Sequence, residues 1–439
     1  MDRISNLSDD LLLKILSSLP TKDIVETMFL SKRWKFLWTM VPKLDFDDGC
    51  LTDYNDDEDE YTKFLQYVDR LMVLHKPPVL ETLKFTIGYL SSIEDMATWI
   101  RVAIVRRVRE LEINRHHPQD LDSFTLPRCL FTYEKLVVLK LRRSIFLDLP
   151  LELEVWLPSL KTLHLLSVKH ENEASHRNLL AGCPVLEELV VDKTFNDPVP
   201  SFYVIVPSLK RLSIIEQDCN EESTEESPVV YNNRVLIDVP SLKYLDYVDV
   251  YDFGHVCSSK NMPELVEANV KLVSKSPGKL MRSITSVKRL SLCLYGSVLK
   301  HNIVFYQLVH LELCGCSSKW WDLLTWMLER SPKLQVLKLN NCVERSFCLV
   351  KPIEVFWRQP RSVPECLMCH LSTFEWKYYT GIHEEKELVA YILRNAKRLK
   401  TAQISATALG LDSEGGPRKL KELASLHRAS KSCQLLLIC

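Results

Sequence analysis

The chain has 439 residues and a formal net charge of −1, which allow two or three domains or one extended repeat array and give no overall attraction to nucleic acid or membranes. Its 11 glycines exclude a collagen-like chain, and no apolar run in the sequence is long enough to span a membrane. The 14 cysteines are irregularly spaced and the N-terminal sequence has no export leader, so we expect reduced thiols and a cytoplasmic or nuclear protein.

The first elements along the chain are three short predicted helices within residues 2–46. Ser8 is placed to cap the first helix, whose leucines recur at helical spacing until Pro20 ends it. Thr21 is placed to cap the second, and the third carries two tryptophans four residues apart on one side. A unit of this size is too small to bury so much apolar surface. Either the rest of the chain covers it, as in a plain N-terminal cap, or a partner does.

Several motifs of this segment follow one another in a fixed order. They are Asp2-Arg3-Ile4, Leu11-Leu12-x-x-Ile15-Leu16-x-x-Leu19-Pro20, Leu30-Ser31-Lys32-Arg33-Trp34, Leu37-Trp38 and Pro42-x-Leu44-x-Phe46-Asp47. Together they closely resemble a plant F-box over residues 1–47, with Ser8 standing where the family usually has proline. The resemblance implies docking to a SKP-type adaptor through Leu7, Leu11, Leu12, Ile15, Leu16, Leu19, Pro20, Leu30, Trp34 and Trp38.

An acidic stretch follows at residues 48–60. Such a charge block is typical of a solvated linker, and the spacing of an EF-hand calcium loop is absent from it. We therefore expect this linker to hold the N-terminal helices away from the rest of the chain. From Tyr61, apolar residues return at helical spacing and end before Pro77.

The remainder of the chain is dominated by one repeated phrase, apolar-x-x-apolar-x-apolar. Its last three positions alternate in, out and in, as a short strand does. Proline phrases such as Leu157-Pro158-Ser159 precede many copies and end the preceding element. The copies begin at Leu80, Val108, Leu136, Leu160, Leu186, Leu209, Leu242, Leu265, Val287, Leu308 and Leu334, the one at Leu265 being degenerate.

This pattern predicts a leucine-rich-repeat solenoid over residues 61–355, in which stacking buries leucines that no single repeat could bury. Segments such as 177–181 and 321–330 suit a helix or an irregular turn that returns to the next strand. The competing interpretation is an ordinary α/β domain with frequent Leu-x-Leu strands. Stacked repeats give a curved parallel sheet whose outward-facing column is suited to binding a protein.

The outward residues of this column are mixed in character, so we expect a protein target and no nucleic acid. The target-binding residues predicted on this concave face are Glu112, Lys140, His164, Asp246, Glu312 and Lys338. The strongest basic cluster, Arg106-Arg107-Val108-Arg109, ends an amphipathic helix and reads as a solvated face, with a phosphate-rich small ligand as the alternative. Residues 216–226 form an acidic, polar insert that predicts a loop.

The pattern changes near Val363. Strands are expected at 371–376 and 399–404, helices at 384–395 and 419–426, and a last strand at 432–437. The phrases Phe374-Glu375-Trp376, Tyr391-Ile392-Leu393-x-Asn395-Ala396 and Ser432-Cys433-Gln434-Leu435 resemble the FBD region that ends many plant F-box/leucine-rich-repeat proteins. The resemblance implies an FBD domain at 356–439 that caps the open end of the repeats.

Cys366-x-x-Cys369-His370 matches a haem-attachment spacing, and it could also form half of a zinc site with Cys314 and Cys316. Neither is expected, because haem attachment belongs to exported proteins and nothing in the sequence brings a second ligand pair close. Hydrolase, P-loop and zincin motifs are absent from the sequence. We expect no metal, no cofactor and no catalytic residues.

The sequence thus predicts an α/β protein: a three-helix F-box, a leucine-rich-repeat solenoid and an FBD region. By resemblance, it is the non-catalytic substrate receptor of an SCF-type cullin ubiquitin ligase, linked through a SKP-type adaptor to the cullin and RING subunits and holding an unknown protein target. Two alternatives stay open. In one, Ser8 marks an F-box that no longer binds the adaptor, which leaves an interaction scaffold. In the other, a small molecule completes the target surface.

Overall fold

The computed structural model describes residues 4, 7–48, 58–76, 80–88, 92–115, 124–193, 199, 201–216, 234–249, 256–274, 277–296, 303–315, 320–341, 357–406 and 422–438. These residues belong to two compact units, Met1–Leu209 and Lys210–Cys439. Most of the predicted acidic linker, and the insert beyond residue 216, lie outside the described residues. In the described part of the chain, no helix has both the length and the apolar character needed to cross a membrane.

The N-terminal helices form as the leucine spacing predicts, in short pieces. Their shared interior holds one face of each helix, including Leu12, Ile24 and Leu37. Two of the pieces are 3₁₀ turns, which close the sharp bends between helices too short to be stable alone. The elements are α1 (Asp9–Leu16), α2 (Thr21–Glu26), η2 (Thr27–Phe29), α3 (Trp34–Leu37) and η3 (Trp38–Met40).

The sequence predicted that the side chains of Ser8 and Thr21 cap the first two helices, and both predictions are wrong. Ser8 does occupy the N-cap position of α1, but its side chain makes no capping hydrogen bond. The N-cap of α2 is Pro20, and Thr21 is the first helical residue. The buried hydroxyl oxygen of Thr21 instead accepts a hydrogen bond of 2.6 Å from the backbone N–H of Asp45. Thr21 therefore ties the helices to the strand that follows them.

In the first unit, the repeated phrase forms parallel strands in direct register. Leu44, Leu83 and Leu111 are successive Cα partners, and the same register continues through Leu139, Leu163 and Leu189. The inward leucines are almost completely buried, which contributes about 2 kcal/mol for each side chain. The strands are β1 (Lys43–Asp47), β2 (Thr82–Ile87), β3 (Glu110–Arg115), β5 (Val138–Arg142), β7 (Thr162–Leu166) and β9 (Glu188–Lys193).

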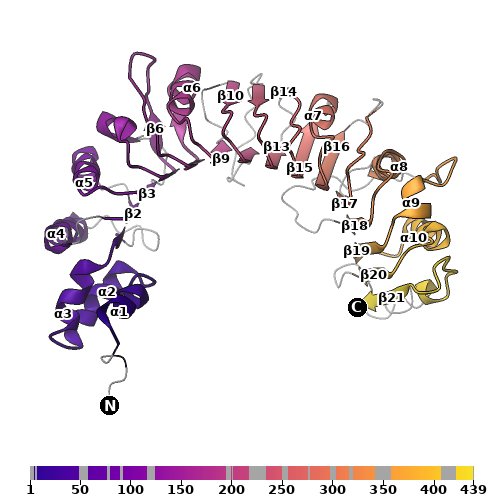
Figure 1. The fold of residues 1–439 in the computed structure, drawn as a ribbon, viewed down its shortest axis with the longest axis horizontal. Helices are drawn as coiled ribbons and strands as arrows, with labels where there is room; N and C mark the ends of the chain where they lie inside the picture. The colour runs from indigo at the N-terminus through magenta and orange to yellow at the C-terminus, as the bar shows by residue number, and fades with distance from the viewer. Residues whose placement is uncertain are drawn as a thin grey trace. The chain divides into compact units, whose positions relative to one another are not determined.

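Helices and short strands of this unit cover the face opposite the exposed column (Figure 1). The helices are α4 (Glu58–Leu74), α5 (Ile93–Val105), η4 (Arg128–Thr132) and α6 (Glu173–Ala181). Residues 177–181, expected as a helix or an irregular turn, are thus the end of a helix. Elsewhere the chain returns through a second row of short strands that the sequence pattern did not predict: β4 (Phe124–Thr125), β6 (Ile145–Leu147), β8 (Lys169–His170) and β10 (Ser201–Ile205).

The N-terminal helices are joined directly to the first repeats, so the expectation that they are held apart is wrong. The last segment of the F-box resemblance is itself a strand of the sheet, since β1 pairs with β2 from Lys43 to Asp47. Phe46 stacks on Phe85 with ring centroids 5.4 Å apart, and Phe85 stacks on Trp99 of α5 at 5.1 Å. A continuous core therefore connects the helical module to the repeats.

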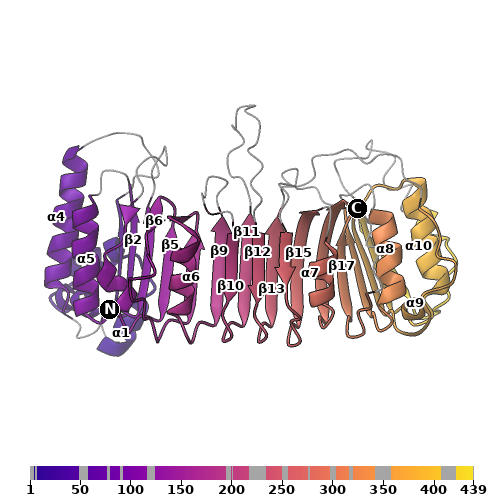
Figure 2. The same ribbon diagram turned by 90° about the horizontal axis from the view of Figure 1, so that it is seen from above.

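The second unit repeats the same construction, with its parallel strands side by side (Figure 2). Leu212, Leu245, Ala268, Leu290, Leu311 and Leu337 are successive register partners, so the degenerate copy at Leu265 is a strand like the others. The strands of this sheet are β11 (Arg211–Glu216), β13 (Tyr244–Asp249), β15 (Glu267–Ser274), β16 (Arg289–Gly296), β17 (His310–Cys314) and β18 (Val336–Asn340). Outside it, β12 (Arg234–Asp238) pairs with β14 (Val256–Ser259).

The C-terminal strands extend this sheet in the same register. Leu337, Phe374, Ala402 and Leu435 are successive partners, through β19 (Thr373–Tyr379), β20 (Thr401–Ala406) and β21 (Gln434–Ile438). The helices of the unit are α7 (Gly278–Ser283), α8 (Trp320–Arg330), α9 (Glu365–Cys369) and α10 (His383–Asn395). The strands and the helix expected at 384–395 are confirmed, and the helix expected at 419–426 is described only from residue 422.

Candidate interaction surfaces

The helical module presents a group of apolar side chains to solvent. Phe29, the last residue of η2, is 83% exposed, and Leu30, which follows it, is 67% exposed. A single exposed apolar residue is ordinary, but several on one module of this size indicate a surface that a partner covers. The F-box surface consists of Leu11, Ile15, Phe29, Leu30, Phe36 and Met40.

The structure divides the ten predicted adaptor contacts between this surface and the interior. Leu11, Ile15, Pro20 and Leu30 are exposed, and Leu7 and Leu19 are half-buried. The other four, Leu12, Leu16, Trp34 and Trp38, lie in the core with at most 5% of each side chain exposed, so they hold the module together and offer no surface to a partner. Phe29, Phe36 and Met40 are also exposed and were not among the predicted contacts.

Arg33 holds the residues at the start of α1 in place through hydrogen bonds of its side chain. The Arg33 guanidinium donates to the Asp9 carboxylate through Nε at 2.9 Å and Nη2 at 2.5 Å, and Nη2 also donates to the Leu7 carbonyl at 2.6 Å. These bonds fix the start of α1 against α3. Ser8, between the two acceptors, has a φ of −64°, the angle that a proline ring imposes, so the path of the chain is the one a proline would give.

A second set of hydrogen bonds, called here the His75–Arg106 brace, lies where the helical module meets the repeats. The buried His75 has Nε2 2.5 Å from the Val41 carbonyl and Nδ1 2.6 Å from Nη2 of Arg106. Since a guanidinium only donates, Nδ1 accepts and Nε2 carries the proton given to Val41. Arg106 also donates to the carbonyls of Met72 and His75. Burial, aided by the Arg106 charge and opposed by the Val41 hydrogen bond, lowers the pKa of His75 to about 4.

This brace changes the interpretation of the basic cluster at 106–109. Arg106 points inward to His75 and Met72, and it caps the C-terminus of α5. The cluster is therefore not the uniformly solvated helix end that the sequence predicted, and its first arginine is used by the fold.

In the first unit, the predicted target-binding residues Glu112, Lys140 and His164 lie in one row on the outward face of the parallel strands. Lys84, Glu112, Lys140 and His164 are successive register partners. Charges of opposite sign neutralise one another along this face. The ion pairs are Lys84–Asp45 at 3.9 Å and Arg142–Glu112 at 3.5 Å, and His164 Nε2 lies 3.1 Å from the Glu188 carboxylate.

The second unit has an equivalent column that contains the other three predicted residues. Asp246 accepts hydrogen bonds from Ser213 and Asn269 on the two neighbouring strands, at 3.1 and 2.8 Å. Lys338 pairs with Glu375 at 3.4 Å. Glu312 is the register partner of Lys338. All three residues lie on the outward face, as predicted, and are partly exposed.

The Cys366-x-x-Cys369-His370 motif lies on and just after the short helix α9, and its two thiols differ in exposure. Cys366 is buried and its Sγ donates to the Leu328 carbonyl at 3.3 Å, whereas Cys369 is exposed. Burial raises the pKa of the Cys366 thiol to about 12, so it stays protonated at neutral pH. In the described residues, Cys366 contributes to the packing between α9 and α8 through its contact with Leu328.

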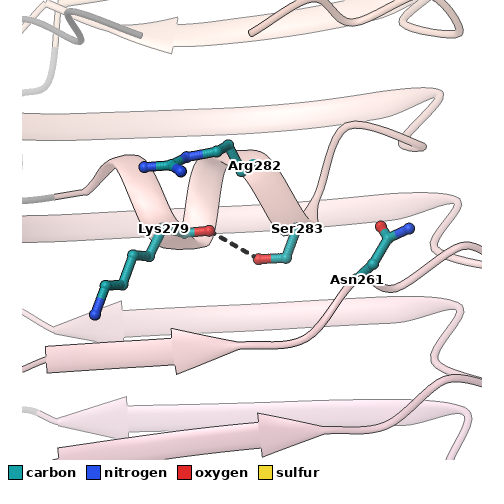
Figure 3. Close-up of a pocket in the computed structure, with 4 residues that line it drawn as sticks. All are labelled: Asn261, Lys279, Arg282 and Ser283. Carbon is teal, nitrogen blue, oxygen red and sulfur yellow. Dashed lines mark hydrogen bonds between the residues drawn. The ribbon is translucent and has the colours of Figure 1, made fainter.

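A shallow cavity of about 250 Å³ lies beside α7 (Figure 3). Asn261, Lys279, Arg282 and Ser283 line it. The Ser283 hydroxyl donates to the carbonyls of Lys279 and Leu280, and Arg282 Nε donates to Gly278, so two of the four polar groups are already used within the helix. Its open, cationic lining offers little apolar surface to a drug-sized ligand.

A small helical module with an exposed apolar surface, joined to stacked parallel-strand repeats, defines a protein-interaction class of molecule. Three family models match the chain: the F-box domain over residues 4–46, the LRR repeats of FBD-associated F-box protein At5g56370 over 96–249, and FBD over 359–404. The F-box match implies binding of a SKP-type adaptor.

The relatives cover the whole chain. FBD-associated F-box protein At3g50710 of Arabidopsis thaliana is 53% identical over 443 residues, with 100% of both proteins covered. F-box/FBD/LRR-repeat protein At4g26340 of the same plant is 43% identical over 99% of this chain and 100% of its own. F-box/FBD/LRR-repeat protein At5g56420 is 42% identical over 99% and 98%. The chain belongs to the F-box/FBD/LRR-repeat family of plant proteins.

Proposed function

We propose that the chain is the substrate receptor of an SCF-type cullin ubiquitin ligase. The observation that carries this proposal is the F-box surface, a set of apolar side chains left exposed by a module that otherwise buries its leucines and tryptophans. A SKP-type adaptor covers this surface and links the chain to the cullin and RING subunits. The proposal places the protein in the cytoplasm, the nucleus or both, where that machinery operates.

The contribution of this chain to ubiquitin transfer is proximity. The repeats hold a protein target while the ligase brings the ubiquitin-loaded enzyme, which turns a bimolecular encounter into a local one. This task asks for a fixed geometry between the F-box and the first repeats. Strand β1, the Thr21–Asp45 hydrogen bond and the His75–Arg106 brace supply it within the first unit.

The alternative of an F-box that no longer binds the adaptor rested on Ser8. Its backbone angle matches that of proline, and Arg33 holds the residues on both sides of it. These contacts support a working adaptor surface, because the backbone at Ser8 has a φ that proline also adopts.

Co-expression with a SKP-type adaptor, followed by affinity capture, tests the proposal. We expect the intact chain to retain the adaptor and the Ile15→Asp variant to lose it, because a buried carboxylate at an apolar interface carries a large desolvation cost. Val73→Asp is the matched control, since Val73 is an apolar side chain on α4 that is 82% exposed and outside the F-box surface. Failure of the intact chain to retain the adaptor would overturn the proposal.

A further inference from the structure

A row of exposed cations crosses the second unit where its parallel strands begin. Arg211 and Arg289 are the first residues of β11 and β16, and Lys210, Lys243 and Lys288 directly precede β11, β13 and β16. All five side chains are exposed. We call these five residues the basic strip.

The strand register places the basic strip along one edge. Arg211, Tyr244, Glu267 and Arg289 are successive Cα partners on β11, β13, β15 and β16. The carbonyl of Lys210 accepts hydrogen bonds from the N–H groups of Lys243 and Tyr244, so the lysines also lie on neighbouring strands. Strands in a sheet are about 4.8 Å apart, and the two ends of the strip are therefore separated by about 14 Å.

The side chain of Arg211 is restrained by the aromatic ring of Tyr244. Its guanidinium carbon lies 3.9 Å from the centroid of the Tyr244 ring. Stacking on a ring restrains the side chain and leaves the planar N–H fork free at its edge, where it can bind a carboxylate with two parallel hydrogen bonds. Within the described residues, Arg211, Lys243, Lys288 and Arg289 have no ion-pair partner.

The same positions of the first unit carry both signs of charge. Lys161, which precedes β7, pairs with Glu187 at 3.7 Å. Glu110 accepts a hydrogen bond from Thr82, and Glu188 pairs with His164. Two adjacent cations occupy this position on β11 and β16 of the second unit, whereas in the first unit Arg109 is followed by Glu110 and Lys161 by Thr162.

We propose that the basic strip binds an acidic peptide segment of the protein target, which rests on the proposed receptor function and names the chemistry of its target. Charge complementarity selects this occupant. An extended chain advances about 3.3 Å for each residue, so the 14 Å between the ends of the strip corresponds to about four residues.

The middle of the strip sets a spacing rule for the peptide. Glu267 lies on β15 between the two cationic ends and is exposed. An acidic residue directly above Glu267 would be repelled. The segment therefore has acidic residues about four positions apart, with uncharged residues between them. A nucleic-acid backbone, with a phosphate at every nucleotide, cannot leave such a gap, and Asp246 and Glu312 on the same face repel it further.

Fluorescence anisotropy with the full chain tests the rule. The probe is a labelled peptide with the core Glu-Glu-Ser-Gly-Glu-Glu in a Gly-Ser background. Its isomer, Ser-Glu-Glu-Glu-Glu-Gly, has the same charge with the gap removed, and a Gln version has no charge. We expect the gapped probe to bind more tightly than the isomer by about fivefold, the Gln version not to bind, and salt to weaken binding.

Variants locate the site. Arg211→Glu and Lys288→Glu should each weaken binding of the gapped probe by about tenfold, because a reversal exchanges attraction for repulsion at exposed, screened positions. Glu267→Gln should remove the preference for the gap. Lys161→Glu, at the equivalent position of the first unit, is the matched control and should leave binding unchanged.

Equal loss of binding in Lys161→Glu, or no dependence on the gap, would overturn the proposal. Tighter binding of a twelve-residue oligothymidine, lost in the Arg211 and Lys288 variants, would overturn it in favour of nucleic acid. Adaptor capture is measured on the same variants. A chain that retains the adaptor but ignores the peptides contradicts only the basic strip, whereas loss of the adaptor by the intact chain contradicts the proposed function.

Discussion

Acidification should loosen the joint between the F-box and the repeats, because His75 must become charged inside it. The side chain is 4% exposed, and its pKa in the folded chain is about 4. In the unfolded chain the pKa of a histidine is about 6.5. Between these two values the unfolded state binds more protons, so the free energy of unfolding falls as the pH falls through this window.

The size of the effect follows from the two pKa values. Linkage gives a loss of about 2 kcal/mol in the free energy of unfolding between pH 8 and pH 5, approaching about 3 kcal/mol below pH 4. Other groups also titrate in this range, Asp192 among them, since burial raises its pKa to about 6. The informative quantity is therefore the difference between the intact chain and a His75→Gln variant, in which these other contributions cancel.

Urea unfolding followed by tryptophan fluorescence at several pH values measures this difference, since Trp38 and Trp99 are buried near the joint. We expect the pH dependence of stability to be shallower in His75→Gln by about 2 kcal/mol between pH 8 and pH 5. His427→Gln, which replaces an exposed histidine, is the control and should match the intact chain. Parallel curves for the intact chain and His75→Gln would refute the reasoning.

Five further substitutions test the account: two pairs compare an interior residue with a surface residue, and one removes the hydrogen bonds of a turn. Leu12→Ala should lower the free energy of unfolding by about 3 kcal/mol because the side chain is fully buried, whereas Leu11→Ala should change it by about 0.5 kcal/mol or less; denaturant midpoints compare them. Phe46→Ala should cost about 3–5 kcal/mol through loss of its stacked contacts, and Phe36→Ala, on the exposed surface, should lower adaptor affinity with little change in thermal stability. Asn178→Ala should cost about 1–3 kcal/mol and speed hydrogen exchange at 149–153, because its amide donates to the carbonyls of that turn; protection equal to the intact chain would contradict this.

The repeats could be predicted because their signal is local and redundant. Each copy of the phrase alternates with a period of two residues, and a register error would turn every leucine to solvent. The same pattern runs through Leu44 and Phe46 before the recognised repeats, and through Phe374 and Trp376 after them. The sequence therefore already contained the continuation of the sheet into both flanking regions.

The sequence shows that the F-box helices carry surplus apolar residues, but it does not show which of these residues face solvent. Helix α1 carries Leu11, Leu12, Leu13, Ile15 and Leu16, which is more than one face of a helix can bury. Which stripe turns inward depends on the neighbouring helices, and local periodicity does not contain that information. The second row of strands was missed for a related reason, since elements such as β4 and β8 have two residues each and no period to detect.

The basic strip could not be predicted from the central outward position of each strand alone. Arg211 and Arg289 lie two residues earlier, on the same face, and Lys243 precedes its strand. Their proximity depends on the parallel register, which brings residues far apart in the sequence to one edge.

Affinity capture from proteasome-inhibited plant cells tests the receptor account most directly, with the intact chain compared with Ile15→Asp. Deleting residues 1–47 is unsuitable, because it removes β1 and uncovers the core of the first repeats. The account predicts that both baits retain the same target proteins. It also predicts that only the intact chain retains the adaptor and cullin, and that targets carry ubiquitin only in its presence. Equal ubiquitin on the targets captured by both baits, or absence of the cullin from the intact bait, would contradict it.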